Sequence, residues 1–424
     1  MTAGTTSRSP HPWWVGLVSG MASYIDAAAI VGFGTAMVIY QRAVGLSATT
    51  IGIASAALTL GIAVGALAGG VLGDRLGRRP VFSATMILIV AGAATLALST
   101  QDGLILGGAL VLGLGAGADL PVSLSTISEA ATDANRGKLI GFSQVLWFVG
   151  ILAAIGLGIL FGNAGQLGGQ IMFCHVAVTA AAVMLARLTI PESEAWLTAR
   201  ASSVPGVRKG HVRELLGPAH RAPFLALITF YSLTNLSANT IGQFGSFLLV
   251  NVAGLDVRAA SALALPFLPL GIVGTFWFMA IADGRRRFTY FTVGAVLMVL
   301  GNVIPAVFGL TVATYIASRI VTLLGAAFAG EAIMKTWAQE SFPTLLRTTA
   351  QGSVIAVARL LAALVAGFTP LLITAGTSVL FSLLSAASLL GLAAAWLVFR
   401  GREGRSEFRA EQVELSAAES VPGR

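Results

Sequence analysis

The chain alternates between long apolar runs and short polar loops, and this alternation constrains its fold more than any other feature. Twelve runs have roughly the 20 residues that an α-helix needs to cross about 30 Å of hydrocarbon. They cover residues 15–40, 48–72, 81–100, 104–128, 139–161, 169–190, 223–250, 259–282, 288–309, 312–337, 349–373 and 377–399. Only 10% of the 424 residues are charged, too few to cover a water-facing surface, since soluble domains have about 25%. The sequence therefore predicts an all-α membrane protein with twelve transmembrane helices.

Basic residues are divided unevenly between the loops of the two membrane sides. The loops on the side of both termini hold 20 of the 26 Lys and Arg residues, whereas the opposite loops hold only Arg42 and Arg258. Lys and Arg accumulate in cytoplasmic loops of membrane proteins. We therefore expect a multi-pass protein of the inner (plasma) membrane with both termini in the cytoplasm. The net charge of +8 belongs to these loops, so we expect no nucleic-acid partner.

The longest polar stretch, 191–222, divides the chain into two halves that resemble each other. Three landmarks recur at an offset of 209 or 211 positions: Asp74 with Asp283, Glu129 with Glu340, and Arg136 with Arg347. A duplicated six-helix unit is typical of transporters whose site lies between the two halves.

The predicted domains follow from this division. They are a cytoplasmic segment at 1–14, a six-helix bundle at 15–190, a cytoplasmic linker at 191–222, a second bundle at 223–399 and a polar tail at 400–424. The composition of the tail predicts disorder.

Two motifs then indicate a family. The pattern Gly-x-x-x-Asp-Arg-x-Gly-Arg-Arg at 70–79 resembles the signature loop of the major facilitator superfamily. The stretch Pro-Glu-Ser-Glu-Ala-Trp-Leu at 191–197 is similar to the Pro-Glu-Ser-Pro-Arg-Trp-Leu of its sugar porter and metabolite:proton symporter branch. The resemblance spans essentially the whole chain. It implies two pseudo-symmetric six-helix bundles, the fold of this superfamily, working by alternating access.

Two departures leave the substrate open. The Arg that proton-coupled sugar porters place early in helix 4 has no counterpart at 107–110, and Gly-Glu-Ala-Ile-Met-Lys at 330–335 replaces their Gly-Pro-x-x-Trp. Gly-Ala-Asp-Leu-Pro at 117–121 is instead similar to the Gly-Gly-Asp-Tyr-Pro of phosphate:proton symporters, although the acidic helix 7 of those carriers is absent. Sugar, polyol, sugar acid and aromatic acid all remain.

Three acidic residues within the apolar runs are candidates for proton coupling. Asp26 lies halfway along the first run, where a charged carboxylate costs about 2.5–3.5 kcal/mol and usually has a function; proton-coupled relatives also carry a helix 1 Asp. Asp119 precedes Pro121, so freed backbone groups could hold it instead. Glu331 maps close to Asp119 in the repeat, but its i,i+4 spacing to Lys335 equally predicts a structural ion pair.

The seventh run is unusually polar and predicts a substrate-binding face. Asn235, Asn239 and Gln243 follow helical spacing and so share one face, and amides are costly against lipid. Arg359 could bind an anion or neutralise an acid, and Trp147 could stack on a sugar ring or simply pack. The predicted substrate-binding residues are Gln144, Trp147, Asn235, Asn239, Gln243, Lys335 and Arg359.

Charges at the cytoplasmic helix ends are candidates for gating. An Asp can cap a helix, and arginines can pair with acids across the two halves, which would hold the cytoplasmic side closed. The simpler alternative, charges that only set topology, accounts for some of the arginines. The predicted gating residues are Gly73, Asp74, Arg75, Gly77, Arg78, Arg79, Glu129, Arg136, Asp283, Arg285, Glu340 and Arg347.

Glycines at helical spacing occur in the second and fourth runs. They are Gly61, Gly65 and Gly69, and Gly113, Gly115 and Gly117. We interpret them as small residues that let membrane helices pack closely.

The sequence thus predicts a secondary active transporter, with proton-coupled uptake of a small polar metabolite (sugar, polyol, or sugar or organic acid); the alternative is proton-driven efflux. No nucleophile–base set or metal-ligand spacing appears, and the single cysteine, Cys174, excludes a cysteine metal cluster. We therefore expect no enzyme activity, no metal and no cofactor, with the proton gradient as energy source. The expected partners are a small-molecule substrate, protons and membrane lipids, and we expect a monomer.

Overall fold

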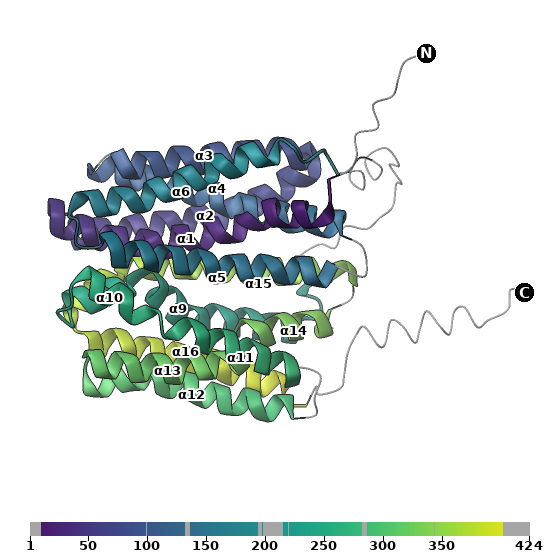
Figure 1. Ribbon diagram of the computed structural model, residues 1–424. Coiled ribbons are helices and arrows are strands. Elements are labelled where there is room, and N and C mark those ends of the chain that lie inside the picture. Colours follow the sequence, from purple (N-terminus) through teal and green to yellow (C-terminus); the bar gives the residue numbers. More distant parts are fainter. Residues whose placement is uncertain are drawn as a thin grey trace, which may run out of the picture. The chain divides into compact units, whose positions relative to one another are not determined.

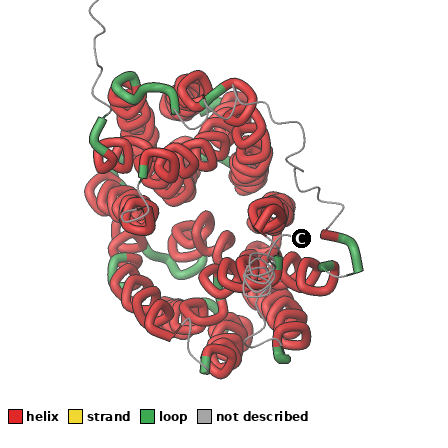
Figure 2. The backbone as a smooth tube through the Cα atoms, turned by 90° about the vertical axis from the view of Figure 1, so that its right-hand side faces the viewer, coloured by secondary structure: helices red, strands yellow, loops and turns green. Residues whose placement is uncertain are grey.

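A computed structural model describes residues 10–98, 100–131, 136–193, 197, 215–218, 220–281, 286–342 and 344–401. Every extended regular element within these ranges is an α-helix (Figure 2). The helices are α1 (Pro12–Val44), α2 (Ala48–Leu76), α3 (Arg78–Leu98), α4 (Asp102–Ala130), α5 (Arg136–Phe161), α6 (Gln166–Arg187), α9 (Arg221–Asn251), α10 (Val257–Ala264), α11 (Phe267–Ile281), α12 (Arg287–Phe308), α13 (Val312–Ala329), α14 (Glu331–Ser341), α15 (Thr344–Ala375) and α16 (Thr377–Phe399).

These helices form twelve membrane crossings. Within the described residues, eleven stretches are long and apolar enough to cross a bilayer, and α10 with α11 and α13 with α14 each form one of them. The 31-residue α9 is long enough but is not among the eleven. Its many amides and hydroxyls explain why, because they lower its hydropathy. With α9 as the seventh crossing, the predicted all-α fold of twelve transmembrane helices is confirmed.

The chain forms two compact units. Unit 1 comprises Met1–Pro205, Gly242–Val250 and Leu255–Leu265, and unit 2 comprises Gly206–Ile241, Asn251–Gly254 and Pro266–Arg424. In unit 1, α3 lies beside α4 and α6, and α1 beside α5; in unit 2, α12 lies beside α13 and α16 (Figure 1). Residues 242–250, the last third of α9, thus belong to unit 1 and not to the bundle predicted for 223–399. Most of the predicted linker and nearly all of the predicted tail lie outside the described residues.

Glycines bring α2 and α4 of unit 1 into backbone contact. A Cβ added at Gly61 would lie 2.6 Å from the carbonyl oxygen of Leu110, far inside van der Waals distance. The same collision with backbone atoms would occur at Gly65, Gly69, Gly113 and Gly117. The predicted close packing is therefore confirmed for this helix pair. Small residues serve it because membrane helices associate by van der Waals packing.

The duplication extends to glycine packing within each unit. A Cβ at Gly115 of α4 would lie 2.8 Å from the backbone nitrogen of Ile89 in α3. A Cβ at Gly325 of α13 would lie 2.6 Å from the carbonyl oxygen of Gly294 in α12. Gly115 and Gly325 are 210 positions apart, close to the offset of the sequence landmarks. Both units therefore use the same contact between equivalent helices.

Two crossings of the second half are broken, whereas the sequence predicted continuous helices over 259–282 and 312–337. The first break lies between α10 and α11, where Pro266 has no N–H and its ring obstructs a continuing helix. The second lies at Gly330, whose φ of −106° and ψ of −144° are far from helical values. Their counterparts α2 and α4 are unbroken helices of 29 residues each, α4 despite its internal Pro121.

Candidate functional site

Asp26 is buried in unit 1. It is 4% exposed and lies near the middle of α1, which packs against α4, α5 and α6. Two residues before it, the Tyr24 carbonyl lies directly against Gly150 of α5. The structure thus places the predicted coupling acid within the bundle, where an ionised carboxylate is costly.

A second polar contact joins α1 to α6 in the same unit. The Tyr24 hydroxyl and His175 Nε2 lie 2.7 Å apart. The two residues lie 151 positions apart, so no local pattern in the sequence indicates this contact. The contact satisfies a polar ring that would otherwise be exposed to hydrocarbon.

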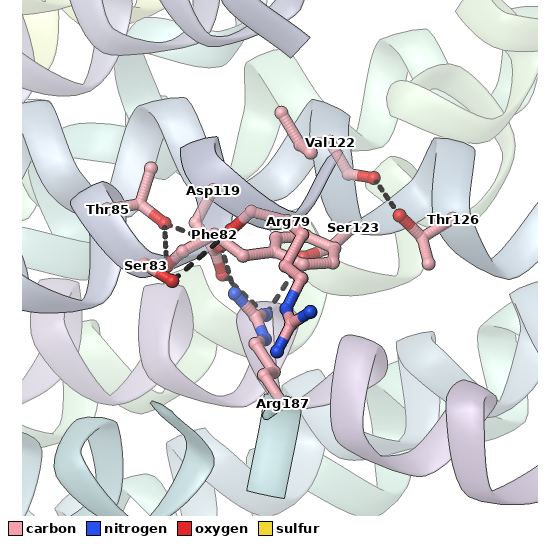
Figure 3. A network of polar contacts seen from close by, with 9 residues as sticks. All are labelled: Arg79, Phe82, Ser83, Thr85, Asp119, Val122, Ser123, Thr126 and Arg187. Carbon is pink, nitrogen blue, oxygen red and sulfur yellow. Dashed lines mark hydrogen bonds and ion pairs between the residues drawn. The ribbon is translucent and has the colours of Figure 1, made fainter. Parts of the chain in front are cut away.

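Asp119 forms a closed ion pair with Arg187 (Figure 3). Arg187 Nη2 donates to Asp119 Oδ2 at 2.9 Å and to Ser123 Oγ at 2.9 Å, while Nη1 pairs with Asp119 Oδ1. Thr85 Oγ1 donates to the same carboxylate at 3.0 Å, and the guanidinium carbon lies 4.2 Å from the centre of the Phe82 ring.

This geometry bears on the role of Asp119. Asp119 is 1% exposed and Arg187 is 4% exposed. The carboxylate thus has a buried guanidinium partner and one hydroxyl donor, Thr85, and the pair joins α4 to α6. This is the geometry of a structural ion pair, and proton coupling by Asp119 stays a prediction. No local pattern in the sequence indicates this partner, because Arg187 lies 68 positions away at the end of another helix.

Glu129 and Glu340, which the sequence predicts at cytoplasmic helix ends, form equivalent ion pairs in the two units. Arg78 Nη2 lies 2.7 Å from Glu129 Oε1. Arg287 binds Glu340 with two parallel hydrogen bonds of 2.7 Å. Both pairs join helices of one unit, whereas the sequence predicted pairing across the halves. Arg287 was missed, although it lies 209 positions after Arg78, the offset between Asp74 and Asp283.

Glu192 fixes the turn between α2 and α3. Its carboxylate accepts hydrogen bonds from the backbone N–H groups of Arg78 at 2.7 Å and Arg79 at 3.1 Å. These are the first two residues of α3, whose N–H groups have no partner within the helix. Gly77 precedes them with φ +100°, a value that side-chain-bearing residues rarely adopt. The motif at 191–197 therefore contributes a cap to the signature loop at 70–79.

The other predicted gating residues are less informative. A Cβ added at Gly73 would lie 3.0 Å from the side chain of Val122, and Arg75 and Arg79 are exposed. Five fall outside what the structure describes: Asp283 and Arg285 altogether, and the side chains of Asp74, Arg136 and Arg347. The gating role stays a prediction.

Unit 2 contains a partly exposed cluster of polar and charged side chains. Lys335 Nζ lies 2.6 Å from Glu331 Oε1, as their spacing predicts, and the two side chains are 46% and 50% exposed. The Tyr231 hydroxyl forms a hydrogen bond with Glu331. Glu331 is the first residue of α14, where the positive end of the helix dipole favours an acid.

Arg359 extends this cluster along α9. Its Nη1 donates to Asn239 Oδ1 at 3.3 Å. Asn239 Nδ2 in turn donates to the Asn235 carbonyl oxygen at 3.1 Å and also to the Asn235 side chain. Arg359 interacts electrostatically with Glu331, but among the described residues no carboxylate forms an ion pair with it. The two asparagines and both predicted cations thus belong to one unit.

The remaining predicted substrate residues belong to unit 1. Gln243 is 3% exposed, and its Nε2 donates to Thr59 Oγ1 at 2.6 Å, while its Oε1 has no hydrogen-bond partner in the part of the chain that the structure describes. Gln144 is exposed. Trp147 packs edge-on against Phe148, with ring centroids 5.4 Å apart.

Comparison with known proteins decides the family. The family model described as "Major Facilitator Superfamily" matches residues 13–370. The chain belongs to the major facilitator superfamily. It is 31% identical over 393 residues to the "Minor myo-inositol transporter IolF" of Bacillus subtilis (strain 168), covering 89% of each chain. It is also 31% identical over 184 residues to the "Glucose transporter GlcP" of Staphylococcus epidermidis, covering 43% of this chain and 40% of that one.

Solved structures of this superfamily agree on the fold. The crystal structure of a D-xylose-proton symporter matches with a TM-score of 0.75 and 16% identity, covering 92% of this chain and 98% of that one. The chain is therefore a multi-pass membrane protein and a transporter of the major facilitator superfamily.

Proposed function

We propose that this transporter takes up a small polar metabolite (a sugar, a polyol, or a sugar or organic acid) together with protons, by alternating access. The observation that carries the proposal is the similarity to a myo-inositol transporter over 89% of both chains. The polar cluster of unit 2 supports it, because amide, hydroxyl and charged groups within membrane helices are the partners that a polyhydroxylated substrate needs.

Asp26 is our proposed proton carrier. The resemblance to proton-coupled members of the superfamily supports this role, because those relatives also carry an Asp in helix 1. Asp26 is buried at the middle of α1, where a carboxylate is costly when charged and is most simply explained by function.

The proton gradient is the proposed energy source, with no cofactor. One proton moving through 100 mV releases about 2.3 kcal/mol, enough for a roughly fiftyfold substrate gradient. We further propose that both termini lie in the cytoplasm, on the basis of the loop charges, and that the protein is a monomer.

Reconstitution of the full chain into liposomes tests the proposal. With an acidic exterior, we expect labelled myo-inositol, glucose or a related compound to accumulate above its external concentration. A protonophore should collapse the accumulation, and protein-free liposomes provide the control. Expulsion of preloaded substrate toward the acidic side would instead establish efflux, and equilibration alone would contradict proton coupling.

A further inference from the structure

The polar cluster of unit 2 carries a net positive charge. Its one acid, Glu331, forms an ion pair with Lys335 at 2.6 Å and a hydrogen bond with the neutral Tyr231. Arg359 adds a second cation near the middle of the span Ala350–Ala375. Two bases and one acid leave one positive charge in excess. An uncompensated cation at membrane depth is costly, and such residues commonly mark a substrate pathway.

The guanidinium of Arg359 has N–H donors with no acceptor among the described residues. Of its five N–H donors, one, at Nη1, donates to Asn239. Asn239 is itself held by Asn235, so the amide orients the guanidinium without neutralising it. The side chain of Arg359 is only partly buried. Arg187 of unit 1 provides the contrast, since Asp119, Ser123 and the Phe82 ring enclose it.

The functional groups of the cluster indicate the class of ligand that it can bind. The flat guanidinium fork binds a carboxylate with two parallel hydrogen bonds. Glu331 can accept and Lys335 and Asn235 can donate hydrogen bonds to hydroxyl groups. Resting on the proposed uptake function, we propose that the substrate is a polyhydroxylated monocarboxylate, a sugar acid, whose carboxylate binds Arg359. A single negative charge balances the excess charge of the cluster, whereas a phosphate monoester would exceed it.

Matched substrate pairs test this inference on the purified full-length protein. The members of each pair differ at one carbon, which is a carboxylate in the acid and a CH2OH group in the neutral analogue, and share the other hydroxyl groups: glucuronate and glucose, galacturonate and galactose, gluconate and sorbitol. Binding is measured by calorimetry, and uptake in liposomes under a pH gradient. In the pair that binds best, we expect the acid to bind roughly tenfold more tightly than its neutral analogue, as for a hydrogen-bonded charged group.

The variant Arg359→Gln should remove this preference. We expect affinity for the acid to fall roughly tenfold while that for the neutral analogue stays within about twofold. Arg319→Gln is the matched control, because Arg319 is another membrane arginine, lying 6.0 Å from the Phe267 ring and outside the cluster. It should preserve the preference. If Arg359→Gln does not fold, the wild-type affinities for the acid and for its neutral analogue test the inference. A roughly tenfold preference for the acid supports it, and equal affinities overturn it.

The outcomes separate this inference from the proposed function. Uptake of neutral sugars or polyols with equal or weaker binding of the acids overturns the inference and leaves the proposed function intact. Equal losses for both members of a pair in Arg359→Gln would reduce Arg359 to a structural role. Tighter binding of glucose 6-phosphate than of glucuronate would overturn the carboxylate assignment. If no compound of either class accumulates, both proposals fail.

Discussion

The two units share the same helix packing, but the charged side chains within their membrane helices differ in burial and in pairing. In unit 1, Asp119 and Arg187 are 1% and 4% exposed and satisfy each other. In unit 2, Glu331 and Lys335 are about half exposed, and Arg359 has only an amide partner among the described residues. The same fold therefore holds a closed ion pair in one unit and an accessible, unbalanced cluster in the other.

The two units also differ in whether equivalent helices are continuous. The unbroken α4 of unit 1 corresponds to α13 and α14 of unit 2, which are separated at Gly330. Discontinuous helices mark binding sites in many transporters, since their free ends can contact a ligand. Glu331 stands directly at this break. Duplication thus kept the helix packing and the ion pairs of Glu129 and Glu340, while the helix centres diverged into a closed ion pair in unit 1 and, in our proposal, a substrate-binding cluster in unit 2.

Removing Asp119 should have the largest effect on stability. Asp119→Ala leaves Arg187 buried without its counter-ion, which costs about 3–5 kcal/mol. Glu331→Ala in unit 2 should cost only about 0.2–1 kcal/mol, because the pair is half exposed. Denaturant unfolding of the purified variants in detergent measures both values.

A double variant provides the control for this comparison. Asp119→Leu combined with Arg187→Met removes both charges and should recover most of the lost stability. Similar losses for Asp119→Ala and Glu331→Ala would show that the two units do not differ as described.

Replacing equivalent glycines with valine tests whether the two units have the same close helix packing. Gly115→Val and Gly325→Val should each cost about 1–3 kcal/mol, because a side chain would meet backbone atoms of the neighbouring helix. Gly107→Ala is the control, as its Cβ would meet nothing within 4 Å. Thermal unfolding measures all three. A neutral Gly325→Val beside a damaging Gly115→Val would restrict the close packing to unit 1.

The ion pairs of Glu129 and Glu340 should give the smallest effects. Glu129→Gln and Glu340→Gln each remove a partly exposed ion pair worth about 0.2–1 kcal/mol, at most a roughly fivefold change in transport rate. We expect both to lower the initial uptake rate with little change in substrate affinity. Arg221→Gln, an exposed side chain outside the predicted gating and substrate-binding sets, should match the wild type. A loss of affinity exceeding the loss of rate would place these acids in substrate binding.

The fold could be predicted from the sequence because the hydropathy of a segment depends only on the residues of that segment. The run predicted at 223–250 became α9 at Arg221–Asn251, and every other run became a membrane crossing. The two breaks were missed although Pro266 and Gly330 are visible in the sequence, because apolar character continues through both. Hydropathy detects a membrane crossing, whereas a break depends on backbone geometry.

The site was predictable only where partners are close in sequence or related by the repeat. Glu331 and Lys335 are four residues apart, so helical spacing sufficed. Arg287 could have been predicted from Arg78, because the two lie 209 positions apart, one of the offsets of the repeat. The pairing of Asp119 with Arg187 needs the packing of α4 against its neighbours, which no local pattern encodes.

The most direct measurement compares two transport modes of Asp26→Asn in liposomes. If Asp26 of unit 1 couples the proton and unit 2 recognises the substrate, uphill accumulation should fall from as much as roughly fiftyfold at 100 mV to none. Counterflow exchange of the same substrate, which needs no net proton movement, should persist. Uphill accumulation that survives in Asp26→Asn would contradict the account.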